Sequence, residues 1–243
     1  MIEKADNLTK AQKEELFKRI QQLHKNLIEK RIILVDGIIS NPIGKQIEEV
    51  IDILEKTGDT ADMYINSPGG STQAFLGIIE KIKSSKLKIK TICLEQAGSG
   101  AMLLLAMGNE RLALPYSEIT TFNYLWVKET EETKTDEGMI EAGKAIIKTK
   151  NDVEKIYKEI TKEKGIPLLK ELFNAKKITA EEAVKYGIID KITGKWKNKE
   201  AVKEFNSLLS AFTAFFYHNK HSVPITLPLS FITGFKRACS GNI

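Results

Sequence analysis

The sequence repeats one order of local patterns, in which an apolar strand-like run is followed by a turn and then by a helical pattern. The run Arg31–Val35 ends at a turn, and in residues 43–54 apolar side chains recur at the spacing of a helix with one buried face. Two further strand and helix units follow at Met63–Ile82 and Leu87–Met107. Strands that alternate with helices favour parallel pairing through right-handed crossovers. The sequence therefore predicts an α/β fold with a βαβ core.

The length and composition of the chain allow one core domain with appendages. Its 243 residues, of which 42% are hydrophobic, suffice to bury a sizeable core. We expect an N-terminal helical segment at 1–30, a core domain at 31–193 and a C-terminal extension at 194–243. The aromatic stretch Val202–Tyr217 is shorter than the about 20 apolar residues that a membrane-spanning helix needs, so no transmembrane segment is expected.

Charge and cysteine content narrow the function classes. The net charge of +5 comes from 37 basic and 32 acidic residues, and the chain has no arginine–aromatic cluster, so we expect no nucleic-acid binding. Cys93 and Cys239 give neither a disulfide framework nor metal-ligand spacing, and no metal or other cofactor is indicated. The N-terminus has early acidic residues and no apolar leader, so we expect a cytoplasmic protein.

Ser99 lies where an apolar strand-like piece gives way to an apolar helical pattern. The first N–H groups of a helix have no intrahelical acceptor, and the flanking residues Gly98 and Gly100 allow a substrate backbone to come close. This place suits the nucleophile of an acyl transfer. A serine before a helix is also a common N-cap, and the residues alone leave both interpretations open.

A second glycine turn follows the strand-like residues Met63–Ile65. In the sequence Ile65-Asn-Ser-Pro-Gly-Gly-Ser71, the bare N–H groups of Gly69 and Gly70 are able to donate hydrogen bonds to an oxyanion or to an extended peptide. The alternative is an ordinary turn between a strand and a helix.

Taken together, these segments resemble the proteolytic subunit of the Clp protease, a barrel-forming serine peptidase that works with ATP-driven unfoldases. The resemblance runs from about Leu27 to about Ile192. Five segments carry it in the family's order: Arg31–Val35, Tyr64–Ser71, Thr91–Ser99, Ala113–Pro115 and Ile178–Asp190.

The resemblance implies an architecture and an assembly. The fold expected from it is a ClpP/crotonase-type βαβ superhelix with a protruding handle at about 127–163, in which a strand at Val127–Thr135 leads into a helix at Gly138–Glu163. It also implies heptameric rings, built with itself or with a ClpP-like paralogue, a Clp-type AAA+ unfoldase as partner, and unfolded polypeptide as substrate. The pattern of 138–163 by itself is also compatible with a helix packed on its own subunit.

The resemblance also assigns the site residues. The nucleophile falls on Ser99, and the oxyanion donors fall on the N–H groups of Gly70 and Gly100. The histidine position, counted from Pro115, is Phe122, and the aspartate position, counted from Thr179, is Ala175. A phenyl ring cannot accept a proton, so the resemblance implies a catalytically impaired subunit.

Three functions remain open from the sequence. The first is an impaired Clp-type subunit that acts in ring assembly or regulation, and the second is an active serine endopeptidase that uses Ser99 with another base, such as a lysine. The third is a scaffold that holds peptides. The chain's three histidines, His24, His218 and His221, all lie outside the matched core, and His24 is expected on the surface. Whether the chain is an enzyme therefore stays undecided.

Overall fold

The computed structural model describes residues 10–123 and 135–194. The chain divides into two compact units. One takes in Met1–Ile32 and Trp196–Ile243, of which the structure describes residues 10–32, and the other spans Ile33–Lys195.

The N-terminal helix is α1, Lys10–Glu29, as its charged helical pattern predicts. Leu23, Leu27 and Ile28 are buried along its last turns. His24 is half-buried rather than fully on the surface, because it lies among these buried neighbours in sequence, and burial lowers the pKa of its imidazole.

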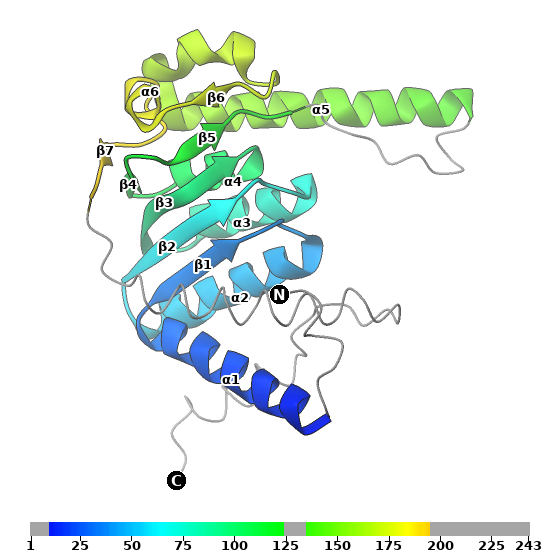
Figure 1. The fold of residues 1–243 in the computed structure, drawn as a ribbon. Helices are drawn as coiled ribbons and strands as arrows, with labels where there is room; N and C mark the ends of the chain where they lie inside the picture. Colours follow the sequence, from blue (N-terminus) through cyan, green and yellow to red (C-terminus); the bar gives the residue numbers. More distant parts are fainter. Residues whose placement is uncertain (1–9, 124–134, 195–243) are drawn as a thin grey trace. The chain divides into compact units, whose positions relative to one another are not determined.

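The centre of the larger unit is a sheet whose main strands lie side by side in Figure 1. Its order is β1-β2-β3-β4-β7, with β1 at Ile32–Asp36, β2 at Thr60–Ser67, β3 at Lys88–Gly98, β4 at Glu110–Ala113 and β7 at Lys191–Ile192. The pairs β2–β3, β3–β4 and β4–β7 are parallel. This arrangement confirms the predicted α/β fold.

Three helices cover one face of this sheet (Figure 1): α2 at Asn41–Thr57, α3 at Thr72–Ser84 and α4 at Gly100–Ala106. Helix α2 buries the apolar face that the sequence pattern predicts, with Ile47, Val50, Ile51 and Leu54 turned inward. Every residue of α4 is buried, as expected for a helix that lacks a polar face.

Two short strands, β5 and β6, connect residues 177–178 to the end of β3. Strand β5, Glu118–Thr120, runs parallel to the last residues of β3 and antiparallel to β6, Lys177–Ile178. Helix α6, Ala180–Lys185, follows β6 and begins with a capping box between Thr179 and Glu182.

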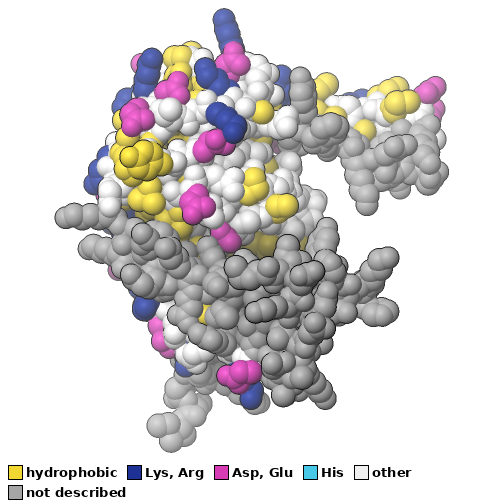
Figure 2. Space-filling model, viewed as in Figure 1, with side chains coloured by type: hydrophobic (Ala, Val, Ile, Leu, Met, Phe, Trp, Pro, Cys, Tyr) yellow, Lys and Arg dark blue, Asp and Glu magenta, His cyan; other side chains and the backbone are white. Residues whose placement is uncertain are grey.

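Helix α5, Asp136–Thr161, is the longest described helix and confirms the helix predicted at 138–163. Its side chains Val153, Ile156, Tyr157 and Thr161 are buried in its second half, and its first half extends away from the sheet (Figure 1). Met139, Ile140 and Ile147 are more than half exposed on this projecting part, where Figure 2 shows hydrophobic side chains at the surface. The 3₁₀ segment η3, Lys162–Glu171, follows α5.

Other predicted segments lie outside the described residues: most of the strand at Val127–Thr135, and the extension from Lys195 onward with its aromatic stretch Val202–Tyr217. Across residues 10–123 and 135–194, the structure contains no helix with the length and apolar character needed to cross a membrane.

Candidate active site

Ser99 occupies a strained turn between β3 and α4. Its backbone φ is 52° and its ψ is −123°, a region that side-chain-bearing residues rarely adopt. Its N–H donates to the Thr120 carbonyl at 2.9 Å, which ties the turn to β5. Such a conformation costs of order 1–3 kcal/mol and persists only where the surrounding structure enforces it.

The N-cap alternative for Ser99 is not supported by its hydrogen bonding. Its hydroxyl makes no cap hydrogen bond, although the residue stands at the N-cap position of α4. Ser71, at the N-cap of α3, has φ −58° and accepts from the Ala74 N–H, as an ordinary N-cap does. Ser99 is half-buried, so its hydroxyl is left for contacts other than capping.

The second glycine turn lies directly against Ser99. A Cβ built on Gly69, whose φ is +99°, would lie 2.8 Å from the Ser99 Cβ and 2.7 Å from the Gly98 oxygen. Only a glycine lets the two turns come this close.

Gly70 presents its N–H toward the side of β3. Ile39 donates to the Gly69 oxygen and accepts from the Ser71 N–H, at 2.9 and 2.7 Å, in a parallel bridge centred on Gly70. Because neighbouring residues in a strand hydrogen-bond to opposite sides, the N–H of Gly70 faces away from Ile39. Gly100 is the first residue of α4, so its N–H lacks an intrahelical acceptor. The two predicted oxyanion donors therefore lie on the glycine turn that contacts Ser99 and on the residue that follows Ser99.

Phe122 and Ala175 face each other across a continuation of the β5–β6 pair. The Ala175 N–H donates to the Phe122 oxygen at 2.8 Å, one step beyond the bond between the Thr121 N–H and the Lys176 oxygen. Thr120, the partner of Ser99, lies two residues before Phe122. The structure thus brings the three predicted positions 99, 122 and 175 into one region, although they are far apart in the sequence.

An aromatic cluster occupies this region. Phe122 is fully buried, and its ring centroid lies 5.7 Å from that of Phe75 and 5.7 Å from that of Phe173. The Phe75 ring packs so closely on Gly100 that a Cβ there would lie 2.1 Å from it. The Phe75 ring therefore contacts both the first residue of α4 and the Phe122 ring, and apolar packing surrounds position 122.

The comparison with known proteins gives two findings. A sequence model of the family described as Clp protease matches residues 12–195. The chain is 33% identical over 187 residues to ATP-dependent Clp protease proteolytic subunit 1 of Bacillus cereus (strain ATCC 10987 / NRS 248), a match that covers 74% of this chain and 93% of that protein. The chain belongs to the Clp protease family.

Membership of the Clp protease family makes this α/β unit, with its projecting α5, a ClpP-type fold. Within the described residues, Ser99 makes no side-chain hydrogen bond, and His24, the only histidine among them, belongs to the other unit. In the same part of the chain, no group of three or more His, Cys, Asp or Glu side chains is arranged to hold a metal ion.

The sequence did not single out Phe75 and Phe173, which complete the cluster in this member of the Clp protease family. Phe75 lies on α3 and Phe173 shortly before β6, and only the folded arrangement brings both to Phe122. The Lys150 ammonium of α5 lies 5.2 Å from the Phe173 ring centroid, so a cation–π contact links the long helix to the cluster.

The backbone strain at Ser99 predicts a change in stability. Ser99→Gly should raise the melting temperature by about 2–4 °C, because glycine adopts a positive φ without a Cβ clash and relieves roughly 1 kcal/mol. Ser99→Ala keeps the Cβ and is the matched control. Its melting temperature should equal that of the wild type. Thermal unfolding of the full chain measures both, and equal melting temperatures for glycine and alanine would contradict the strain.

Proposed function

We propose that this chain is a catalytically impaired proteolytic subunit of a Clp-type complex, and that it acts in ring assembly or regulation. One observation carries the proposal: the fully buried phenylalanine at position 122, where the family resemblance places the histidine base. A serine hydroxyl attacks effectively only when an adjacent base takes its proton. Ala175 likewise offers no carboxylate to orient an imidazole.

The remaining architecture suits a subunit that assembles. Met139, Ile140 and Ile147 expose apolar side chains on the projecting part of α5, where packing on its own subunit does not cover them. Exposed apolar stripes of this kind are typical of interfaces between proteins. We propose that they pair with the handles of other subunits, of this chain or of a ClpP-like paralogue, in heptameric rings that receive unfolded polypeptide from a Clp-type AAA+ unfoldase in the cytoplasm.

A peptide-holding role is the second candidate, and the direction of the Gly70 N–H favours it. An N–H that faces away from Ile39, just beyond the end of β2, is able to pair with an extended chain, whether or not bonds are cut. This role predicts that uncleaved peptide binds to the Gly69–Gly70 edge. Peptide binding that is unchanged in folded variants of Gly69 and Gly70 would argue against it.

Peptide cleavage by the purified full chain tests the proposed impairment. We expect the wild type and Ser99→Ala to show the same background cleavage of a short fluorogenic peptide, because loss of the triad base costs on the order of 10⁶ in turnover. In rings mixed with an active Clp-type proteolytic subunit, cleavage should also be indifferent to Ser99→Ala in this chain.

The control is the nucleophile variant of the active partner subunit, which should abolish cleavage by the mixed sample. If the chain alone cleaves the peptide and Ser99→Ala removes that activity, another side chain acts as the base that takes the proton of Ser99. The chain would then be an active serine endopeptidase, and the proposed impairment would be wrong.

A further inference from the structure

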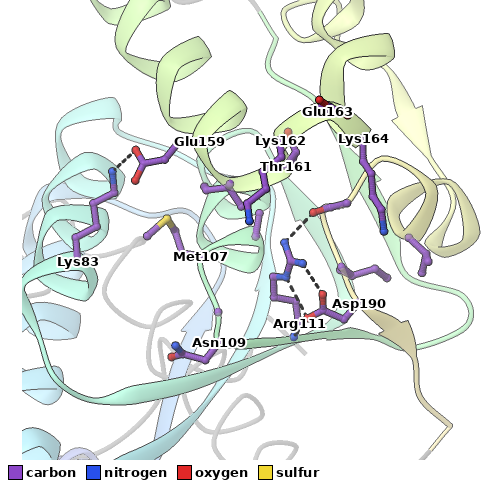
Figure 3. Close-up of a pocket in the computed structure, with 16 residues that line it drawn as sticks. Lys83, Met107, Asn109, Arg111, Glu159, Thr161, Lys162, Glu163, Lys164 and Asp190 are labelled. Atoms are coloured by element: carbon purple, nitrogen blue, oxygen red, sulfur yellow. Dashed lines mark hydrogen bonds and ion pairs between the residues drawn. The ribbon is translucent and has the colours of Figure 1, made fainter.

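A pocket of about 750 Å³ lies at the opposite end of α5 from its projecting part. Its walls come from the ends of α3 and α4, from β4, from the junction of α5 and η3, and from α6 (Figure 3). All of these elements belong to the unit Ile33–Lys195. The volume is in the range of pockets that bind small organic molecules. The Ser99 turn contributes nothing to its lining.

The acidic groups of the pocket are largely compensated by cations. The Lys83 ammonium forms an ion pair with the Glu159 carboxylate, with 2.8 Å between Nζ and Oε2. The guanidinium of Arg111 binds both oxygens of Asp190, and its third nitrogen donates to the Gly187 oxygen at 2.7 Å. These hydrogen bonds hold the pKa of the Asp190 carboxyl below its usual value, so Asp190 stays ionised and paired.

Two lysines at the start of η3 add positive charge beyond these pairs. Lys162 forms no ion pair with a described residue. Lys164 extends toward the Arg111–Asp190 pair, whereas Glu163 points away from that pair (Figure 3). The lining thus holds four cations, Lys83, Arg111, Lys162 and Lys164, against three carboxylates, Glu159, Glu163 and Asp190. The charge of Lys164 also acts on Asp190, and the cations together leave a positive excess for a ligand.

The backbone at Lys162 is strained in the same sense as at Ser99. Its φ is 53° and its ψ is −140°, which a glycine would adopt at lower cost. Thr161, the residue before Lys162, is buried, and its hydroxyl donates to the Tyr157 oxygen at 2.7 Å. This hydrogen bond holds the residue that precedes the strained position. Backbone strain concentrates at ligand sites, where it holds a side chain in place.

Apolar side chains also line the pocket. Ala106 and Ile189 line it and are almost fully buried, and Met107, Ile160 and Val184 complete it. A ligand that fills this space meets both hydrocarbon and ammonium groups.

We propose that this pocket binds a small anion with an apolar body, such as an organic phosphate or carboxylate. Lys162 and Lys164 bind its anionic group, and the wall that contains Met107 and Ile189 packs on its body. The Arg111–Asp190 pair holds β4 and the segment after α6 together and so keeps the pocket open. The pocket does not include Ser99, so this proposal does not depend on the proposed function.

Calorimetric titration of the full chain with phenyl phosphate at low salt tests the proposal. We expect a dissociation constant of about 1 mM or below. Lys162→Gln and Lys164→Gln should each weaken binding by roughly tenfold, the size expected for a charge-assisted hydrogen bond. Lys170→Gln is the matched control, because Lys170 lies on η3 but outside the pocket and should leave binding unchanged.

Two comparison compounds identify the ligand class. Weaker binding of inorganic phosphate than of phenyl phosphate supports an organic anion, whereas equal binding would overturn the proposed apolar body, because packing on the wall would then add no affinity. Benzyl alcohol, which lacks the anion, should not bind measurably. The proposal is overturned if phenyl phosphate does not bind, if benzyl alcohol binds as tightly, or if the two lysine variants bind like Lys170→Gln while their melting temperatures match the wild type.

Discussion

The double replacement Phe122→His/Ala175→Asp is expected to raise hydrolysis of a fluorogenic peptide by about 10²–10⁴-fold, the contribution typical of a positioned general base. The bond between the Ala175 N–H and the Phe122 oxygen sets these two residues opposite each other, and the Thr120 oxygen ties the same segment to Ser99. An imidazole at 122 would be oriented by a carboxylate at 175, as in a serine triad. Steady-state rates of the full chain measure the gain.

Three controls make the restored activity specific. Adding Ser99→Ala to the double variant should return cleavage to background, and Phe122→His alone should gain far less, because an unoriented imidazole is a poor base. The rate should rise with pH as the imidazole loses its proton, near pH 6.5 for an unperturbed histidine. A folded double variant that gains nothing would show that side chains at 122 and 175 do not reach Ser99.

Phe122→Ala should lower the stability of the chain by about 3–5 kcal/mol, since it removes a fully buried aromatic ring and leaves a cavity between two others. For a chain of this size the loss corresponds to a fall of roughly 6–20 °C in the melting temperature. Thermal unfolding of the full chain followed by circular dichroism measures it.

Tyr116→Ala is the matched control for that loss. Tyr116 is also aromatic, but 98% of it is exposed, so its removal should change stability by no more than about 0.5 kcal/mol. If Phe122→Ala melts within 2 °C of Tyr116→Ala, the ring at 122 is not the packing element described above.

Much of this fold could be predicted because its signals are local. The apolar spacing of 43–54 predicts α2, and the short apolar runs before glycine turns predict the ends of β2 and β3. Ser99 and Gly100 were found because a strand, a small turn and an apolar helix are adjacent in the sequence. The boundaries shifted by only a few residues, since capping and pairing decide where each element ends.

The rest depended on contacts between distant segments. Phe75, Phe122 and Phe173 give no joint signal, because each lies in an unrelated pattern and only strand pairing brings them together. The positive φ of Ala175, 50°, is also unpredictable, since alanine carries no preference for that region. The pocket at Lys162 is built from six elements, and no spacing within one segment indicates it.

The burial of Phe122 has a consequence for how this chain can evolve. On a working site, exchanging a base for a phenyl ring removes activity in one step. Once that ring packs between Phe75 and Phe173, the reverse exchange must place a polar imidazole in an apolar core before the carboxylate at 175 exists to orient it. Under the proposed impairment, this single step back costs stability and regains little activity, so the exchange is hard to reverse. The ClpP-type fold is kept in such a chain, whereas the proposed impairment leaves cleavage to its partner subunits.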